Sequence, residues 1–465
     1  MALLLATALP SCTRPLKDAP PPVAMPEAFS ATGAQPTPDR WWLMLNDADL
    51  AGLVDQSLAG NMTLRILWDR VDQAGAVARR SAAPLYPAVD GTAGTLRERE
   101  KRAGRPALYQ TTLSVGLLAD YEVDLWGRIR STVNAADLEV QATREDLAAA
   151  AITLSATVAN TWYRLVELRG QIALLDGQIR TNEQYLDLTT LRFRTGKVSA
   201  VDVLQQRQLV EATRSEKIQA ESDLKVLEHQ LAILVGRAPA APVAAPGGHL
   251  PALPPLPGTG LPADLVRKRP DTRSAFVRLQ EADQQIAAAV ADQFPRLSLS
   301  ATTVTSAGQL RDLFDNWLAG LAANMVAPLF DGGQRAAEVE RTRAVASERL
   351  HFYGQTVLVA LGEVENALVQ ERQQALFLTS VEQQLALASK ATEQTRQHYV
   401  QGGLDFLRVL DALRSQQRLE RDCLQARREL VGFRIDLYRA LGGGWEMQRP
   451  EESLKVSFNA ENAEK

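Results

Sequence analysis

The stretches FRTGKVSAVDVLQQ (residues 193–206) and YVQGGLDFLRVLDA (residues 399–412) follow one pattern. Each has an aromatic residue, a Gly three positions later, a short polar segment, and a β-branched residue followed by Leu. The two glycines, Gly196 and Gly402, are 206 residues apart. Because Gly tolerates the positive φ that a tight reversal commonly requires, each stretch predicts a helix, a turn and a second helix.

The offset of 206 residues continues without a gap to the end of each half of the chain. The matching pairs are Val203 and Val409, Leu204 and Leu410, Gln219 and Gln425, Ala220 and Ala426, Leu224 and Leu430, Leu231 and Leu437, and Gly236 and Gly442. Two of the Leu pairs are seven residues apart, which is the heptad spacing of packed helices. LWGRIR at Leu125 and LFDGGQR at Leu329 extend the similarity upstream. The chain is therefore predicted to be an internal duplication.

The segment 237–260, RAPAAPVAAPGGHLPALPPLPGTG, separates the two halves, because nearly half of its residues are Pro or Gly and no helix tolerates that density. The expected organisation is a signal peptide (1–11), an extended segment (12–40), a first repeat (41–236), this linker (237–260), a second repeat (261–444) and a polar tail (445–465). Each repeat is expected to contain a helix, a strand pair, a long helix, a Gly turn and a helix.

Alternating apolar and polar residues predict the strands at 113–123, 297–302 and 317–325, with a less distinct one at 86–96. This alternation fits a membrane barrel with apolar side chains outward, and it fits a half-buried soluble sheet equally well. The stretches 129–193 and 334–399 contain no Pro and little Gly, so each predicts a helix of about 100 Å. Helices of that length exclude a compact globular domain and indicate lateral packing in a bundle.

Composition excludes several classes of function. The formal net charge of −4 over 465 residues gives no basic surface for nucleic acid. No apolar run approaches 20 residues, so no transmembrane helix is predicted, and a membrane crossing would need strands. The histidines His229, His249, His351 and His398 are scattered, without metal-ligand spacing. No phosphate loop or nucleophile elbow is present, so we expect neither an enzyme nor a cofactor or metal.

The N-terminal sequence MALLLATALPSC is a short apolar run that ends in a small residue and Cys12. It is similar to a bacterial lipoprotein signal, in which Cys12 becomes the lipidated first residue of the mature protein and carries palmitate-type acyl chains. The alternative is an apolar terminus with an incidental Cys. Cys423, in a charged helical stretch, is expected to be a free thiol.

From residue 41 to residue 444 the chain resembles the TolC family of outer-membrane efflux proteins, in its lipoprotein branch. The similar pieces are WWLMLNDADLAGLVDQSLAGN (41–61), RFRTGKVSAVDVL (192–204), GLPADLVRKRPDTRSA (260–275), APLFDGGQR (327–335) and LDALRS (410–415). The resemblance implies a mainly α protein with a membrane β-barrel. Four strands per chain would form a 12-stranded trimeric barrel, continued by a long α-helical periplasmic tunnel, because membrane barrels need about eight strands or more.

The implied function is a passive exit duct for small molecules in the outer membrane of a Gram-negative bacterium. The implied partners are two further copies of the chain, a periplasmic adaptor (membrane fusion) protein, an inner-membrane RND-type pump and outer-membrane lipid. The alternative from another class is a structural helical-hairpin scaffold or adaptor without channel activity. Such a scaffold explains the helices but not the alternating strands beside each long helix.

Leu407, Asp411 and Arg414 are spaced i, i+4 and i+7, so they share one helix face. By the resemblance this face points into the pore at its narrow end, with Leu407 in an apolar ring and Asp411 in a charged ring. Arg414 or Arg408 would compensate the repelling carboxylates. Asp202 stands where Arg408 stands in the other repeat, so neighbouring hairpins would pair at closure. The alternative is an ordinary surface ion pair between Asp411 and Arg414.

The resemblance also implies contacts at the turns. The residues similar to those that meet an adaptor are Gly196, Lys197, Val198 and Ser199 in the first hairpin, and Gly402, Gly403 and Leu404 in the second. Simple turn chemistry is the alternative. Trp317, at a strand start, is the candidate for a membrane aromatic belt, whereas bundle packing is expected for Trp162.

Overall fold

The computed structural model describes residues 20–36, 38–242, 249–442 and 449, which fall into two compact units. The first, here called the sheet unit, comprises residues 20–24, 69–145 and 273–356. The second, here called the hairpin unit, comprises residues 25–36, 38–68, 146–242, 249–272, 357–442 and 449. Cys12 and the polar tail other than residue 449 lie outside the described residues.

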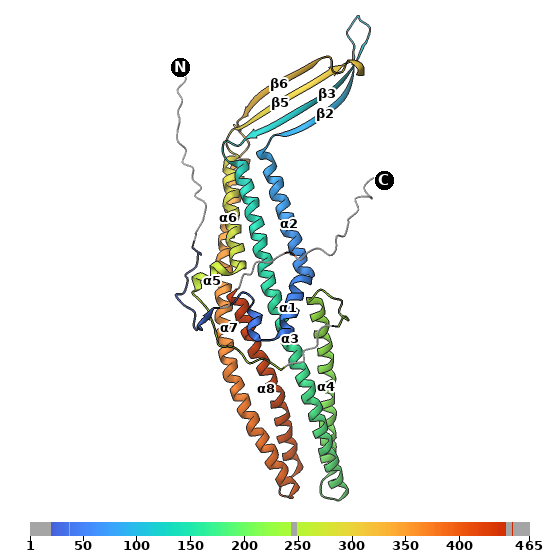
Figure 1. Cartoon of the computed structure of the whole chain (residues 1–465), viewed down its shortest axis with the longest axis vertical. Helices are drawn as coiled ribbons and strands as arrows, with labels where there is room; N and C mark the ends of the chain where they lie inside the picture. The colour runs from blue at the N-terminus through green and yellow to red at the C-terminus, as the bar shows by residue number, and fades with distance from the viewer. Residues whose placement is uncertain (1–19, 37, 243–248, 443–448, 450–465) are drawn as a thin grey trace. The chain divides into compact units, whose positions relative to one another are not determined.

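The helices repeat in the two halves of the chain (Figure 1). The first half contains α1 (Ala48–Gly60), α2 (Met62–Ala82), α3 (Arg128–Arg194) and α4 (Ala200–Leu234). The second contains α5 (Pro262–Lys268), α6 (Pro270–Ala291), α7 (Gln334–Val400) and α8 (Phe406–Leu441). Both α3 and α7 have 67 residues, which confirms the predicted long helices and the duplication. No helix in the described part of the chain is long and apolar enough to cross a bilayer.

The sheet unit contains one antiparallel sheet in the order β2-β3-β5-β6. Its strands are β2 (Ala88–Glu100), β3 (Leu108–Val123), β5 (Arg296–Ala307) and β6 (Trp317–Val326). All predicted strands are confirmed, and β2, the least distinct in the sequence, is longer than expected. β2 and β6 form the two edges of the sheet.

The register places the alternating apolar residues on one face. On β3 this face carries Leu113, Val115, Leu117, Ala119, Tyr121 and Val123. Leu117 lies opposite Gly91 of β2 and Thr303 of β5, and Leu321 of β6 lies opposite Ala301 of β5. Because side chains of a strand alternate between faces, a shift by one residue would move the whole apolar set to the other side.

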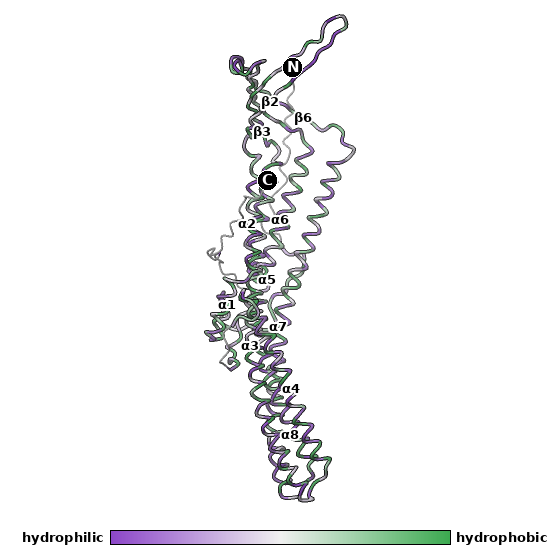
Figure 2. The backbone as a smooth tube through the Cα atoms, turned by 90° about the vertical axis from the view of Figure 1, so that its right-hand side faces the viewer, coloured by the Kyte–Doolittle hydropathy of each residue, from purple (hydrophilic) through white to green (hydrophobic). Residues whose placement is uncertain are grey.

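Aromatic residues form the main core of the hairpin unit. Trp41 and Trp42, in a short 3-10 helix at Trp41–Leu45, are buried together with Trp162 of α3 and Tyr438 of α8. The ring centroids of Trp41 and Tyr438 are 5.5 Å apart in a stacked arrangement. The bundle packing expected for Trp162 is therefore confirmed. Toward the turns of the hairpins, hydrophilic (purple) and hydrophobic (green) residues alternate along the helices in Figure 2, because each helix carries only a narrow apolar stripe.

Each half breaks its first helix at an equivalent place, where the sequence predicts a single helix. Asn61 lies between α1 and α2, and its Nδ2 donates to the carbonyl oxygen of Leu234 at 2.9 Å. Arg269 lies between α5 and α6, and its Nη1 donates to the carbonyl oxygen of Ala440 at 2.9 Å. The last carbonyls of a helix lack partners within it. Asn61 therefore caps the C-terminus of α4, and Arg269 caps the C-terminus of α8. Each capped helix is the last one in the same half of the chain.

Residues 25–36 of the extended N-terminal segment and the described part of the linker lie together in the hairpin unit. β1 (Gln35–Pro36) pairs in parallel with β4 (Pro257–Gly258), and the Ser30 amide donates to Glu365 of α7 at 2.9 Å. The guanidinium of Arg434 donates to the Pro254 carbonyl oxygen at 2.6 Å, and it forms an ion pair with Glu371 of α7 at 2.5 Å. A buried guanidinium therefore holds the described part of the linker against α7 and α8.

Candidate functional site at the hairpin turns

The two turns between long helices have the same backbone structure. In the first, the Gly196 amide donates to Phe193 and the Lys197 amide to Arg192, both at 2.9 Å. In the second, the Gly402 amide donates to Tyr399 at 3.0 Å and the Gly403 amide to His398 at 2.9 Å. This pair of bonds is the Schellman arrangement, which requires a left-handed residue after the helix. Gly196 and Gly402 supply it, with φ of 71° and 84°.

The helices after the turns begin with different caps. Ser199 caps α4, and Asp202 accepts hydrogen bonds from the Ser199 amide and hydroxyl, both at 2.8 Å. In the second repeat Asp405 is itself the cap of α8 and accepts from the Arg408 amide at 3.2 Å. Asp202 therefore completes a reciprocal capping box. Arg408 does not need to do so, which accounts locally for the difference in charge between these equivalent positions.

Four of the predicted gate residues share an exposed strip of α8, whereas the fifth, Asp202, lies on α4 and is partly buried. Leu407 is 49% exposed, and Arg408, Asp411 and Arg414 are exposed beside it. Asp411 makes no ion pair with any residue in the described ranges, so the local pair with Arg414 does not form. Arg414 instead donates to the Gln208 side chain of α4 at 2.9 Å. This strip leaves an unpaired carboxylate one turn beyond an exposed Leu.

A groove of about 520 Å³ lies between α4 and α8 beside this strip. Asp411, Arg414 and Glu216 are among the residues that line it. Arg421 forms an ion pair across the groove with Glu216 at 3.3 Å and donates to Gln178 of α3 at 2.6 Å. The groove is thus lined by charges of both signs, and Asp411 is the carboxylate in it without a partner among the described residues.

An apolar cluster supports the turns from inside. It contains Leu209 of α4, Tyr399 at the end of α7, and Phe406, Val409, Leu410 and Leu413 of α8. Val198 of the first turn packs against it. Residues i, i+3, i+4 and i+7 of α8 are therefore buried, which leaves the opposite face, with Leu407 and Asp411, outward.

One contact between the two hairpins was not predicted from the sequence. Arg192, in the last turn of α3, places its guanidinium carbon 4.2 Å from the centre of the Tyr399 ring. Its Nη1 also donates to the Tyr399 carbonyl oxygen at 3.1 Å. Burial raises the pKa of Tyr399, against the lowering effect of Arg192. The sequence feature that could have indicated this contact is Tyr399, the aromatic residue at the start of the second quoted stretch.

A buried amide network joins the hairpins further along. Gln417 of α8 donates to the Asn182 side chain of α3 at 2.8 Å, and Asn182 donates to Thr213 of α4 at 3.0 Å. Gln206 of α4 donates to the Asn182 carbonyl oxygen at 2.7 Å. Asn182 and Gln206 are fully buried. Buried polar groups of this kind fix the register of packed helices, because a shift leaves them unpaired.

The residues similar to an adaptor-binding tip are accessible in the chain. Gly196, Lys197 and Ser199 are exposed, as are Gly402 and Gly403, and Leu404 is 39% exposed. Trp317, at the start of the edge strand β6, is 74% exposed. The sequence placed these side chains correctly at turn and strand ends; which molecules meet them stays a prediction.

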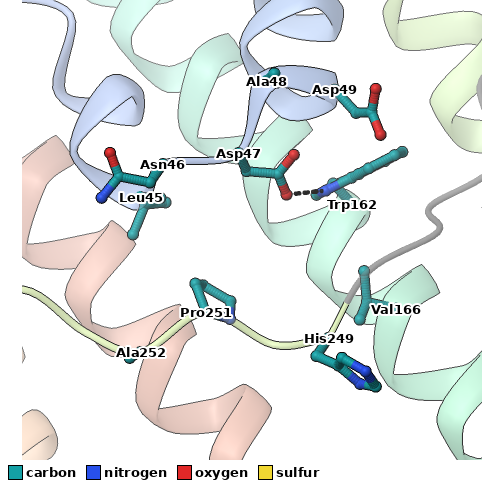
Figure 3. A pocket seen from close by; sticks show the side chains of 10 residues that line it. All are labelled: Leu45, Asn46, Asp47, Ala48, Asp49, Trp162, Val166, His249, Pro251 and Ala252. Atoms are coloured by element: carbon teal, nitrogen blue, oxygen red, sulfur yellow. Dashed lines mark hydrogen bonds between the residues drawn. The ribbon is translucent and has the colours of Figure 1, made fainter.

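A second hollow, of about 490 Å³, lies elsewhere in the hairpin unit and is shown in Figure 3. Asp47 caps α1 through a bond from the Leu50 amide, and its other oxygen accepts from Trp162 Nε1 at 2.8 Å. His249 of the linker lies at its edge. Nowhere among the described residues do three His, Cys, Asp or Glu side chains gather as metal ligands. The two hydrogen bonds of Asp47 cap α1 and orient the Trp162 ring.

A sheet with one apolar face and four long helices in two hairpins define the class of outer-membrane channels. The chain belongs to the outer membrane efflux protein family, whose model matches residues 53–237 and 261–443. The predicted resemblance to this family is thereby confirmed, as are the expected fold class and the outer-membrane location. The protein is an outer-membrane efflux channel that works with efflux-pump components; its family is one of transport proteins and not of enzymes.

The individual relatives agree. The chain is 30% identical to the pyoverdine export outer membrane protein OpmQ of Pseudomonas aeruginosa over 418 residues, 88% of each chain. Among solved structures, it matches the outer-membrane channel OprN with a TM-score of 0.86 and 29% identity, over 92% of this chain and 98% of that one. It matches the open state of the Neisseria gonorrhoeae channel MtrE with a TM-score of 0.83 and 25% identity, over 93% and 98%.

Proposed function

We propose that three copies of this chain form a passive exit duct for small molecules, with a gate at the hairpin turns. The observation that carries the proposal is the pair of open edges, β2 and β6, on a sheet with one apolar face. Unpaired strand edges have no hydrogen-bond partners in hydrocarbon. Pairing β2 of one copy with β6 of the next removes every edge, and three copies give the 12 strands of a closed barrel.

The gate is the exposed strip of α8 with Leu407 and Asp411. In a trimer, three copies of this strip meet around one axis, so Leu407 forms an apolar ring and Asp411 a ring of carboxylates. Like charges at close range repel and need compensation. Arg414 supplies it from the same helix face, and Arg408 supplies it toward Asp202 of a neighbouring hairpin. Apolar constrictions and charged rings are established means of gating pores.

The turns dock a periplasmic adaptor protein, which joins the duct to an inner-membrane RND-type pump. The docking residues are Gly196, Lys197, Val198 and Ser199 in the first turn and Gly402, Gly403 and Leu404 in the second. Their support is the exposure of all of them except Val198, which is partly buried, together with the Schellman bonds that both turns share. The relative OpmQ exports pyoverdine by its name. In this proposal the pump, and not the duct, selects the small molecule.

Lipid on Cys12 anchors the duct in the outer membrane, and Trp317 adds an aromatic contact at the membrane interface. Radiolabelled palmitate supplied to cells tests the anchor. We expect label on the wild-type chain and on Cys423→Ser, and none on Cys12→Ser. Label that persists in Cys12→Ser would remove Cys12 as the site. This lipid is the one covalently attached group that we propose.

Cross-linking between strand edges tests the trimeric barrel. In a Cys423→Ser background, one Cys at Leu321 of β6 is combined with a second Cys moved along β2. We expect at least one position to give disulfide-linked dimers and trimers on a denaturing gel. The matched control moves the second Cys along β3, which is already flanked by β2 and β5 and gives no cross-linked species. Monomers throughout the β2 series would favour the alternative of a scaffold without a barrel.

A further inference from the structure

The β2–β3 hairpin extends beyond the rest of the sheet, as Figure 1 shows. Leu113 of β3 pairs with Ala307, the last residue of β5. Beyond it, residues 96–100 pair only with residues 108–112. Arg97 lies opposite Thr111 and Arg99 opposite Tyr109, and all four continue the face of β3 that carries Leu113 and Leu117. The apolar face of the sheet therefore ends in two arginines around a tyrosine.

The arginines are arranged around the tyrosine ring. The guanidinium carbon of Arg97 is 5.8 Å from the centre of the Tyr109 ring, and that of Arg99 is 5.7 Å from it. All three side chains are exposed. Within the described ranges, neither guanidinium forms an ion pair with a carboxylate. Both therefore retain free N–H donors in a fixed orientation, which suits an anion with several oxygens.

Charge is divided between the two faces of this hairpin. Glu98 and Glu100 alternate with the arginines, so they belong to the opposite face. Glu100 pairs with Arg102 of the turn at 2.5 Å. Solubility alone does not explain why both arginines lie on the apolar face and both carboxylates on the opposite face.

The position of the two arginines along the strand indicates which layer of the membrane they would contact. The apolar face of β3 runs from Val123 to Leu113, ten residues apart. At about 3.4 Å per residue and a tilt of about 40°, this stretch is about 26 Å tall. The apolar band of an outer-membrane barrel is about 25 Å tall. Arg97 and Arg99 lie in the first two rows beyond it, at the level of lipid headgroups.

We propose that Arg97, Arg99 and Tyr109 bind the phosphate of a glycolipid headgroup in the outer leaflet. The proposal rests on the proposed function, since it needs the apolar face of the sheet to contact lipid. The guanidinium pair donates to the phosphate oxygens, and the Tyr109 ring holds both side chains on the lipid side. The source is a membrane lipid and not free phosphate, because the site continues an apolar face that acyl chains cover.

The test measures lipid retained by the full chain. The protein is purified in detergent, mixed with lipid A, passed through a size-exclusion column, and its bound lipid is quantified by mass spectrometry. We expect Arg97→Gln/Arg99→Gln to retain about tenfold less lipid than the wild type, because it loses its hydrogen bonds to a charged group. The control Arg102→Gln/Arg105→Gln removes the same charge from the turn and retains lipid as the wild type does.

Further arms separate the possible ligands. Lipid A without its phosphates is expected to be retained about tenfold less than lipid A, and inorganic phosphate is expected to displace little lipid. Tyr109→Phe keeps the ring and retention, whereas Tyr109→Ala loses retention. Equal retention by both double variants, or displacement by inorganic phosphate alone, would overturn the lipid site while leaving a trimeric duct intact. A wild-type chain that forms no membrane oligomer would overturn the duct, and the lipid site with it.

Discussion

Arg192 and Tyr399 join the two hairpins at their turns, through a ring-to-guanidinium distance of 4.2 Å and a hydrogen bond of 3.1 Å to the backbone. Arg192 lies in the last turn of α3 and Tyr399 in the last turn of α7, so the contact connects the two repeats beside their turns. Tyr399 is buried, whereas Arg192 reaches it from a partly exposed position.

Loss of this link is expected to loosen the turns. Arg192→Ala removes a cation–π contact worth about 0.5–2 kcal/mol. Hydrogen exchange of peptides that cover both turns should become about fivefold faster. Arg194→Ala, two residues along the same helix and exposed, is the control and should leave exchange unchanged. Slower or unaltered exchange in Arg192→Ala would show that the contact does not hold the turns together.

Loss of the buried amide network should affect the thermal stability of the protein more than the rate of hydrogen exchange at the turns. Asn182→Leu leaves the buried Nε2 of Gln417 without its acceptor and the buried Thr213 hydroxyl without its donor, at a cost of about 1–3 kcal/mol for each group. We expect a clear fall in the thermal midpoint of the helical circular dichroism signal. Gln219→Leu replaces an exposed amide on α4 and serves as the control. A variant as stable as the wild type would mean that the helices repack around an apolar side chain.

The two glycines of the second turn should respond differently to the same substitution. Gly402 has a φ of 84°, whereas Gly403 lies outside the left-handed region. Gly402→Ala should therefore cost about 1–2 kcal/mol, and Gly403→Ala should cost little, since its added methyl meets only the His398 carbonyl oxygen at 3.6 Å. Chemical denaturation followed by circular dichroism compares them. Equal losses in both would argue against the Schellman geometry.

Glu228 gives a pH dependence with a definite sign. Burial alone would raise its pKa, but hydrogen bonds from Lys225 and Arg169 outweigh burial and lower it. Its stabilising effect is therefore present above the ordinary Glu value of 4.5 and is lost as the pH falls through the lowered pKa. Glu228→Gln should lower the thermal midpoint at neutral pH, by an effect of about 1 kcal/mol or less.

The difference between Glu228→Gln and the wild type should vanish in acid. Glu211→Gln is the control, because Glu211 forms an exposed ion pair with Arg214 one turn away, with a carboxylate 63% exposed. A difference that stays constant from neutral pH to below the ordinary Glu value would contradict the assignment of the effect to the Glu228 charge.

The sequence predicted the long helices, the turns and all four strands, because each has a local signal: absence of Pro, a Gly with matched flanks, or alternation of apolar residues. It did not predict the Arg192–Tyr399 contact or the Asn182 network, because these join residues more than 200 positions apart or depend on helix register. It correctly placed Leu407 and Asp411 on one face, since that follows from helical spacing alone. It did not reveal that Asp202 completes a helix cap together with Ser199, because the prediction for Asp202 rested only on its charge.

Single-channel conductance in a planar bilayer tests the central claim, a duct gated by the exposed strip of α8. The wild type is compared with Leu407→Ala/Asp411→Ala and with Val201→Ala/Gln205→Ala, which alters the equivalent positions of the first hairpin. We predict a small, mostly closed conductance in the wild type and in the control, and a large, persistent conductance in the Leu407 and Asp411 variant. The absence of any conductance, from protein shown to be folded and assembled, would contradict the account.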